Sequence, residues 1–186
     1  MLSKAVNEIS AFINSVKPPI IIAIDGRCAS GKTTLSDMLR KRFDCGIFHM
    51  DDFFLRPEQR TSARLSQIGG NIDCERFERE VLIPLKKGEH FSYRPFDCGT
   101  MTLSEPVAVE PKKVTIVEGS YSCHPTLEKY YDLKIFVTTS HETQLARLEK
   151  RNPALVGRFK NEWIPMEERY FSGFGIEEKS NIKICT

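Results

Sequence analysis

The sequence has little charge imbalance and contains no long apolar run. Its 186 residues include 27 Lys and Arg against 25 Asp and Glu, a formal net charge of +2. A balance this close to zero provides no broad basic surface for nucleic acid, so any functional cationic cluster must be local. No apolar stretch approaches the roughly 20 residues of a membrane span, and the first residues lack the apolar core of a secretory signal. We therefore expect a cytoplasmic protein without a nucleic-acid or membrane partner.

Cysteine pairs at metal-binding or redox spacing are also missing. The chain has six cysteines and four histidines, but it has no C-x-x-C pair and no spacing typical of a zinc site. In a chain of this length without a secretory signal, we predict free thiols rather than a disulfide framework, and we assign no histidine to a metal. The cysteines are Cys28, Cys45, Cys74, Cys98, Cys123 and Cys185.

The composition of the chain is typical of a globular protein, and the sequence contains one complete phosphate-binding motif. It is 40% hydrophobic and 28% charged, and its length is most simply accounted for by one domain over residues 1–186. Residues 20–35 read I-I-I-A-I-D-G-R-C-A-S-G-K-T-T-L, with the pattern G-x-x-x-x-G-K-[ST] between an apolar run and a helical pattern. This context favours a buried parallel strand, a phosphate loop and a helix over a chance glycine-rich turn.

The residue types of this loop suit an anion. Gly26 and Gly31 let the chain turn so that backbone N–H groups point at phosphate oxygens. The following helix presents its free N–H groups to the same anion, Lys32 reaches the outer phosphates, and the Thr33 hydroxyl ligates Mg²⁺. We interpret Cys28 as a small filler, with an oxidation liability as the alternative. The predicted nucleotide-binding residues are Gly26, Ala29, Ser30, Gly31, Lys32, Thr33 and Thr34.

Two further apolar strands end in acidic residues. Residues 47–50 are followed by Asp51 and Asp52, and residues 114–117 are followed by Glu118. In open α/β sheets the ligand lies at the carboxyl ends of the strands, so Asp51 is placed to accept the proton of an attacking hydroxyl. Glu118 is placed to hold Mg²⁺ or its water shell. The alternatives are a turn with a helix N-cap for the aspartates and a structural hydrogen bond for Glu118.

The rest of the chain alternates helical and strand patterns. Asp73 lies where a helix N-cap is expected, and Thr138, Thr139 and Ser140 are a second set of candidate caps. The other expected elements are an amphipathic helix over 3–16, a polar surface segment over 56–70, a hairpin pairing 91–97 with 107–109, a strand over 133–137 and a last strand over 182–185.

A basic series follows the strand over 133–137. Pro153 and Gly157 interrupt this segment, and a hinged segment with several arginines can close over a nucleotide and neutralise developing charge. We therefore predict an arginine-bearing lid over approximately residues 151–162; the alternative is a solvated charged face. The series comprises Arg147, Arg151, Arg158, Lys160 and Arg169.

Taken in order, the motifs resemble those of a known family. They are D-G-R-C-A-S-G-K-T-T, H-M-D-D-F-F, N-I-D, V-E-G, D-L-K-I-F-V and W-I-P-M, spread from Ile20 to about Phe171. On these residues the chain resembles the uridine kinase and phosphoribulokinase-like group of P-loop kinases, and also the nicotinamide riboside kinases. The resemblance implies the α/β P-loop NTPase fold, with a parallel five-stranded sheet flanked by helices. It also implies ATP with Mg²⁺ as phosphate donor and the 5′-hydroxyl of a nucleoside as acceptor.

The resemblance also implies roles for individual residues. Asp51 matches the carboxylate that activates the hydroxyl, and Asp73 matches the one that grips ribose hydroxyls. Arg151 and Arg158 fall in the lid and are candidate catalytic residues together with Lys32. The candidate contacts to the base are Phe54, Tyr93 and Arg94.

Three departures from the family pattern bear on the acceptor. Ile72 stands where relatives have an aromatic residue, the arginine-rich stretch is shorter than in uridine kinases, and the Pro-Met after Trp163 is similar to nicotinamide riboside kinases. We expect an ATP-dependent kinase with uridine as the favoured acceptor. The alternative is a nicotinamide riboside kinase or another small-molecule kinase. A different class is an NTP hydrolase or nucleotide-binding regulator, although the guanine-reading N-K-x-D motif is absent.

Overall fold

Five of the nine strands form one open, parallel sheet. The computed structural model describes residues 1–186, and the strand order in this sheet is β2-β7-β1-β8-β9. Every pairing in it is parallel. The strands are β1 (Ile20–Gly26), β2 (Cys45–His49), β7 (Val114–Glu118), β8 (Leu133–Thr138) and β9 (Ile182–Cys185). This confirms the predicted fold class.

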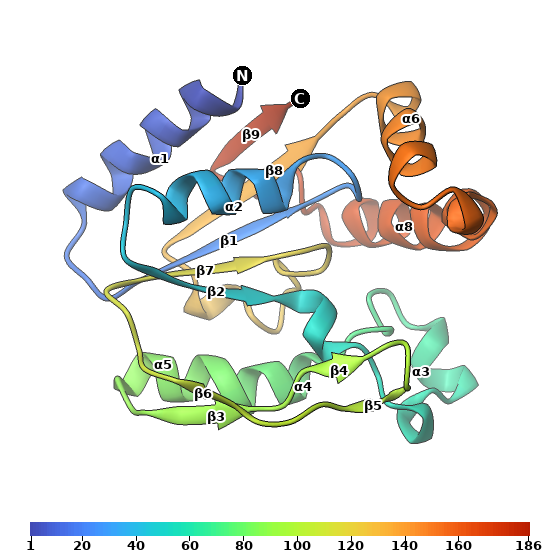
Figure 1. The fold of residues 1–186 in the computed structure, drawn as a ribbon, viewed down its shortest axis with the longest axis horizontal. Coiled ribbons are helices and arrows are strands. Elements are labelled where there is room, and N and C mark those ends of the chain that lie inside the picture. The colour runs from blue at the N-terminus through green and yellow to red at the C-terminus, as the bar shows by residue number, and fades with distance from the viewer.

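Helices cover both faces of the sheet. Figure 1 shows α1 and α2 on one side, and the α4–α5 helix with strands β3 and β6 on the other. The α-helices are α1 (Leu2–Ser15), α2 (Lys32–Arg40), α3 (Ser62–Ser66), α4 (Cys74–Phe77), α5 (Ile83–Lys87), α6 (His141–Arg151), α7 (Val156–Arg158) and α8 (Ile164–Phe174). The 3₁₀ turns are η1 (Met50–Phe53), η2 (Pro57–Gln59), η4 (Glu128–Tyr130) and η5 (Pro153–Leu155), and the π-helical turns are η3 (Glu78–Leu82) and η6 (Phe159–Trp163).

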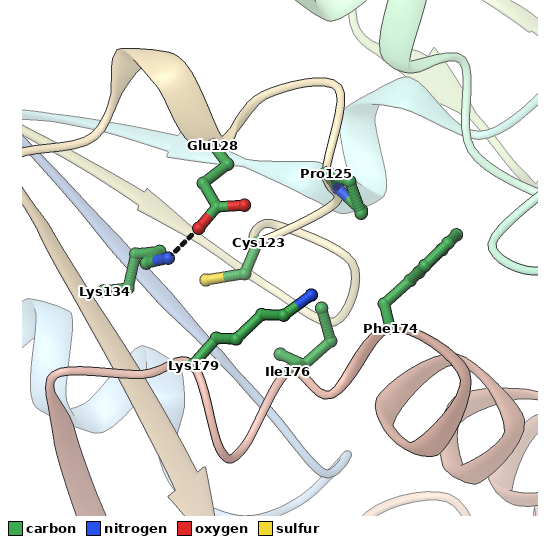
Figure 2. Close-up of a pocket in the computed structure, with 7 residues that line it drawn as sticks. All are labelled: Cys123, Pro125, Glu128, Lys134, Phe174, Ile176 and Lys179. Carbon is green, nitrogen blue, oxygen red and sulfur yellow. Dashed lines mark hydrogen bonds and ion pairs between the residues drawn. The ribbon is translucent and has the colours of Figure 1, made fainter.

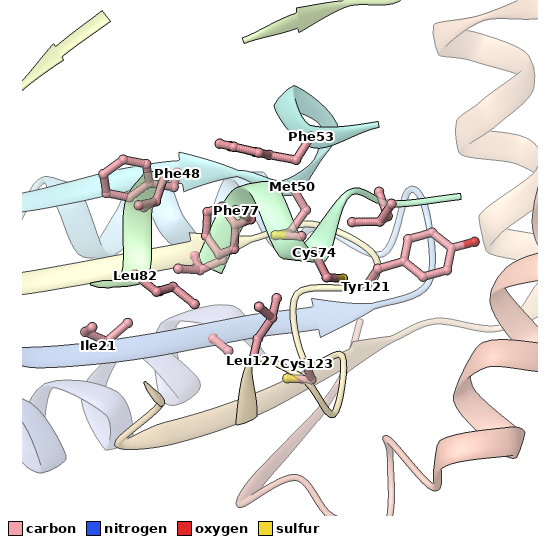
Figure 3. Packing of buried hydrophobic residues seen from close by; sticks show 14 of the residues in the cluster. Ile21, Phe48, Met50, Phe53, Cys74, Phe77, Leu82, Tyr121, Cys123 and Leu127 are labelled. Atoms are coloured by element: carbon pink, nitrogen blue, oxygen red, sulfur yellow. The ribbon is translucent and has the colours of Figure 1, made fainter. Parts of the chain in front are cut away.

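Strand β1 divides the apolar core into two layers. Its side chains alternate between the faces, as the period of two in a strand requires. Ile21 and Ala23 belong to the cluster under α4, α5 and α8, part of which Figure 3 shows. Ile20, Ile22 and Ile24 belong to the cluster under α1 and α2. The continuous apolar run is therefore explained by burial on both faces.

The connections contain more structure than the sequence suggests. The expected hairpin is present, with β3 (Phe91–Tyr93) antiparallel to β6 (Val107–Val109). A second small ribbon, β4 (Phe96–Asp97) with β5 (Thr102–Leu103), extends it. The polar segment over 56–70 carries two short helical elements, η2 and α3. The leading helix, the last strand and the Ser140 cap were predicted correctly, with bounds that differ by about one residue.

All six cysteines are free thiols, as predicted. None of the helices combines the length and the apolar character needed to cross a bilayer.

A buried carboxylate fixes the end of β1 where the phosphate loop begins. Asp25 is fully buried and its two oxygens accept four hydrogen bonds. One oxygen accepts from the backbone N–H groups of Gly26 (2.6 Å) and Tyr121 (3.1 Å). The other accepts from the N–H of Cys123 (2.8 Å) and the hydroxyl of Tyr170 (2.8 Å). The phosphate loop, the segment after β7 and α8 are thereby tied to one side chain.

Burial nevertheless dominates the titration of Asp25. Desolvation raises the pKa of this carboxyl from 3.8 to about 6, although the bonds from Cys123, Tyr170 and Gly26 lower it. Because the pKa in the folded state lies above the unfolded value, protonation of Asp25 favours folding. That contribution is complete below pH 3.8 and is lost as the pH rises through about 6.

We predict that Tyr170→Phe lowers the free energy of unfolding by about 1.5–3 kcal/mol near neutral pH, because it removes a hydrogen bond to a buried charge. The Tyr170 bond favours the ionised carboxyl, so its loss raises the pKa of Asp25 further. The destabilisation should therefore be larger at about pH 7.5 than at about pH 5. Urea unfolding at both pH values measures this difference.

Tyr131→Phe is the matched control, because the Tyr131 hydroxyl is buried without a hydrogen-bond partner. Its removal should leave stability unchanged or slightly increased at both pH values. Equal effects of the two substitutions would show that the Tyr170 hydroxyl contributes nothing through Asp25.

Candidate active site

Three neighbouring strands end side by side and bring the candidate residues together. In the order β2-β7-β1, His49 and Ile24 lie opposite Glu118 on its two sides. Asp51 follows β2 in the turn η1, Glu118 ends β7, and the phosphate loop follows β1. The carboxyl ends of parallel strands thus assemble the loop and both acidic candidates at one edge of the sheet.

The phosphate loop has the backbone geometry of an anion cradle. Gly31 has a φ of 101° and Ala29 a φ of 58°, both in the left-handed region. Gly26 must be glycine, because a Cβ there would lie 1.9 Å from the carbonyl oxygen of Val137. Helix α2 begins at Lys32 without a side-chain cap, so its first N–H groups are available to a ligand.

The side chain of Lys32 lies across the base of the loop. It is buried, and its ammonium donates to the carbonyl oxygens of Gly26 (2.7 Å) and Arg27 (3.0 Å). It also lies 3.4 Å from the hydroxyl of Ser120. The lysine is therefore held in the loop by protein acceptors that a phosphate oxygen can replace. Ser30 is fully buried and its hydroxyl has no protein partner, whereas Thr34 is exposed.

Thr33 and Glu118, the two residues predicted to hold Mg²⁺, contact each other directly. The Thr33 hydroxyl donates to the Glu118 carboxylate at 3.1 Å, and the glutamate is 5% exposed. Hard oxygen donors of this kind fit Mg²⁺, which commonly takes one or two protein ligands and completes its shell with phosphate and water. No group of three or more His, Cys, Asp or Glu side chains is placed to hold a metal by itself.

His49 is a neighbour of this pair that the sequence analysis did not select. Its Nδ1 lies 2.6 Å from the same Glu118 oxygen, and this bond raises the pKa of the imidazole. His49 could have been selected from the H-M-D-D-F-F motif, because it is the last residue of β2 and directly precedes the aspartates.

The two aspartates after β2 have different environments. Asp51 is accessible to solvent, but protein groups surround much of its carboxyl. The resulting loss of hydration raises the pKa of this carboxyl. Lys32 opposes this shift, while Glu118 and Glu167 add to it. Asp52 instead accepts a hydrogen bond from the hydroxyl of Tyr93 at 3.2 Å. Asp51 is thus free for chemistry, and Asp52 is engaged by the hairpin.

Asp73 is a helix cap. One of its oxygens accepts from the backbone N–H of Arg76 (3.1 Å) at the start of α4, and the other accepts from the side-chain amide of Gln59 (2.7 Å). The side chain is almost fully buried. The capping interpretation is therefore confirmed, and the second oxygen is the one within reach of a further group.

The three predicted base contacts are engaged with the protein. Tyr93 is buried, with its ring stacked on Phe53 at 5.4 Å between centroids. Phe54 is half-buried and forms an isolated bridge with Ile72. The guanidinium of Arg94 donates to the carbonyl oxygens of two residues in the β4–β5 region, at 2.6 and 2.9 Å. Base contact by these residues stays a prediction.

The predicted lid is helical and its arginines are exposed. η5, α7 and η6 occupy the segment between α6 and α8. Arg158 pairs with Glu162 at 3.1 Å and lies over the Trp163 ring at 4.7 Å, and Arg151 is exposed at the end of α6. Arg147 is the arginine that contacts the phosphate loop, through the carbonyl oxygen of Ala29 at 3.0 Å.

Two glutamates at the start of α8 pack against the phosphate loop, and the sequence analysis missed them. Glu168 pairs with Arg27 at 2.6 and 2.9 Å. Glu167 is buried and accepts from the backbone N–H of Cys28 (3.0 Å) and the hydroxyl of Ser120 (2.6 Å). In the sequence they are an ordinary acidic pair more than 130 residues from the loop, so only the fold reveals the contact.

Cys28 behaves as a packing residue. Burial, with Glu167 nearby, raises the pKa of its thiol to about 12. Because the thiolate is the reactive form, the structure favours the filler interpretation over an oxidation-sensitive thiol.

Two recesses differ in their capacity for a ligand. A narrow one of about 10 Å³ lies near Cys123 and Lys179, as Figure 2 shows, and has room for about one water molecule. A larger one of about 370 Å³ lies beside Asp73. It is lined by Leu55, Arg56, Gln59, Arg64, Asp73, Glu75 and Arg79.

Comparison with known proteins agrees with this geometry. A family model described as "Phosphoribulokinase / Uridine kinase family" matches residues 21–161. Uridine kinase-like protein 4 of Arabidopsis thaliana is 30% identical in an alignment of 151 positions that covers 76% of this chain and 32% of that protein. Uridine kinase of Staphylococcus epidermidis is 26% identical over 167 residues, covering 81% of this chain and 80% of that protein. The chain thus spans about a third of the length of its Arabidopsis relative.

A solved structure shares the fold. It is named "Structure of a Possible Uridine Kinase from Bacillus stearothermophilus", with a TM-score of 0.74, 17% identity and 98% of each chain covered. The family match spans β1 to the predicted lid and includes the phosphate loop, both strand-end carboxylates and Asp73. On this evidence the chain belongs to the phosphoribulokinase / uridine kinase family.

Proposed function

We propose that the protein is an ATP-dependent kinase that phosphorylates the 5′-hydroxyl of a nucleoside, with uridine as the favoured acceptor. The observation that carries the proposal is the position of Asp51. Its carboxylate has no hydrogen bond to the protein's own groups and lies where Lys32 and Glu118 both influence its pKa. A non-enzymatic nucleotide-binding regulator has no need of a free carboxylate there, and the acceptor dependence of turnover separates a kinase from a hydrolase.

The loop side of the site provides charge neutralisation. The N–H groups at the start of α2 and the ammonium of Lys32 would hold the phosphates of ATP. Thr33 and Glu118 would hold Mg²⁺, directly or through its water shell. When bound, this ion supplies positive charge against the phosphoryl oxygens.

Asp51 would act on the acceptor. A carboxylate with a raised pKa is a better proton acceptor than an ordinary aspartate, because its pKa lies closer to the working pH. It would orient the 5′-hydroxyl for in-line attack and take up its proton. Asp73 would bind the ribose hydroxyls on the same side of the site.

The remaining parts of the proposal concern the lid, the domain and the location. The segment over 151–162 would move so that Arg151 and Arg158, which are exposed in this conformation, face the nucleotide. Residues 1–186 would act as one P-loop kinase domain. A cytoplasmic location is supported by the six free thiols, which persist in a reducing compartment.

The acceptor is tested by ADP release from ATP and Mg²⁺ with uridine, cytidine, nicotinamide riboside, adenosine, pantothenate and simple sugars, against a blank without acceptor. Stimulation by uridine is the expected result, since the relatives reported above are named as uridine kinases. Stimulation by nicotinamide riboside alone would show that the acceptor is not uridine, while the proposed kinase reaction would stand. Turnover that is independent of every acceptor would overturn the kinase proposal in favour of a hydrolase.

Asp51→Asn should reduce phosphoryl transfer by about 10²- to 10⁴-fold, because the amide cannot accept the proton. ATP affinity, measured by calorimetry, should stay within about threefold of the parent value. Asp52→Asn is the control, because the Asp52 carboxylate already accepts a hydrogen bond from the Tyr93 hydroxyl. Normal transfer by the Asp51 variant would eliminate this residue as the base.

Glu118→Gln should raise the Mg²⁺ concentration needed for half-maximal activity by about 10- to 100-fold, because the substitution removes a charge from the proposed metal site. Titration of activity with Mg²⁺ at saturating ATP provides the measurement. Glu110→Gln, at an exposed position on the β6 side of the molecule, should leave the titration unchanged. An unaltered Mg²⁺ requirement in Glu118→Gln would argue for a structural carboxylate.

A further inference from the structure

The cavity of about 370 Å³ beside Asp73 is polar. Of the seven residues that line it, only Leu55 is apolar. A flat apolar ring finds little matching surface in such a cavity, whereas a hydroxylated group finds donors and acceptors. The chemistry of the lining therefore favours the sugar part of a ligand.

This cavity adjoins the segment that carries Asp51. The backbone N–H of Asp73 donates to the carbonyl oxygen of Phe53 at 2.8 Å, and the N–H of Leu55 donates to that of Asn71 at 3.2 Å. The two segments thus run side by side from the end of β2. A ligand in the cavity is held by the same short stretch of chain that positions Asp51.

Gln59 is held in a defined orientation within the lining. Its side-chain oxygen accepts from the backbone N–H of Arg56 (3.0 Å) and from the Arg56 guanidinium (3.1 Å). Since both of these groups are donors, the amide oxygen must face Arg56 and the NH₂ group must face Asp73. That NH₂ group donates to the Asp73 carboxylate at 2.7 Å.

Arg64 and Glu75 of the cavity lining are already engaged with each other. Arg64 donates to both oxygens of Glu75, each at 2.7 Å, and also to backbone carbonyls. One oxygen of Asp73 is used by the α4 cap. The pair of Gln59 amide and remaining Asp73 oxygen is therefore a donor next to an acceptor, with one proton of the amide still to be satisfied.

A donor next to an acceptor matches a vicinal diol. Each hydroxyl both donates and accepts, so one hydroxyl can donate to the carboxylate while its neighbour accepts from the amide. A single hydroxyl or a deoxy sugar can satisfy only one of the two protein groups. The unmatched group would then lose its additional hydrogen bond to the ligand and keep only the bond between Gln59 and Asp73, which costs binding free energy.

We propose that Gln59 is a specificity-determining residue of the acceptor site, where it reads a vicinal diol together with Asp73. Arg56 serves as a positioning residue that fixes the orientation of the Gln59 amide. The inference rests on the proposed function, because it places the sugar of the acceptor in this cavity. It adds to that function a second diol contact and a reason to reject deoxy sugars.

The test compares uridine with 2′-deoxyuridine and 3′-deoxyuridine in the parent protein, Gln59→Ala and Gln67→Ala. The parent should favour uridine, and Gln59→Ala should reduce the ratio of kcat/KM values for uridine over each deoxy analogue by about tenfold. The effect should lie in KM, with kcat for uridine within about threefold. Gln67, an exposed residue at the end of α3, provides the matched control.

A second variant, Gln59→Glu, keeps the shape of the side chain and places a negative charge beside Asp73. It should weaken uridine binding by more than tenfold and lower thermal stability through repulsion of Asp73, while ATP binding stays near the parent value. If Gln59 only anchors η2 to α4, both variants would lower thermal stability and leave the preference for uridine over its deoxy analogues unchanged. That result would overturn the inference.

Calorimetric binding of the three nucleosides separates this inference from the proposed function. Diol-dependent binding that Gln59→Ala abolishes would support the cavity assignment even if no phosphate is transferred, and the kinase proposal would then fail alone. Efficient transfer with an unaltered preference in Gln59→Ala would refute the inference alone. Absence of diol-dependent binding in the parent protein would also refute it.

Discussion

The geometry of the site depends on the buried carboxylate of Asp25. This side chain accepts hydrogen bonds from the first residue of the phosphate loop, from two backbone N–H groups after β7 and from Tyr170 of α8. Burying an ionised group is costly, and its four donors only partly offset that cost. In exchange, the hydrogen bonds to Asp25 fix the relative positions of three segments. The loop, the end of β7 and α8 share one fixed point, so the groups they carry keep their separations.

Glutamates of α8 extend this arrangement to the far side of the loop. Glu168 pairs with the Arg27 side chain, and Glu167 binds the Cys28 N–H and the Ser120 hydroxyl. Ser120 in turn lies next to Lys32. The phosphate loop is therefore supported by its own strand and by a helix that directly follows the predicted lid. A displacement at the start of α8 would reach the loop through two carboxylates rather than through the backbone.

The sequence predicted the features that depend on local pattern. The apolar runs identified the strands of the main sheet, and the strand-end rule alone predicted that Asp51, Glu118 and the loop lie at one edge of the sheet. It could not predict which groups would be occupied by the protein. Tyr93 was a candidate base contact, and the structure places it in the core against Phe53. Glu167 gave no signal because its partner Cys28 is 139 residues away. Gln59 lies in a segment that the sequence marked only as polar, and its contact with Asp73, 14 residues away, gave no local pattern.

The concentration of acidic groups around Asp51 has a consequence for the ligand. Glu118 and Glu167 both raise its pKa, and only Lys32 and His49 act in the opposite direction. In the low-dielectric interior of the site these charges are weakly screened. A fully ionised polyphosphate would therefore be repelled by the same carboxylates that a divalent cation would attract. For a kinase of the proposed kind, the site around Asp51 would bind the complex of the nucleotide with a divalent cation in preference to the free nucleotide anion.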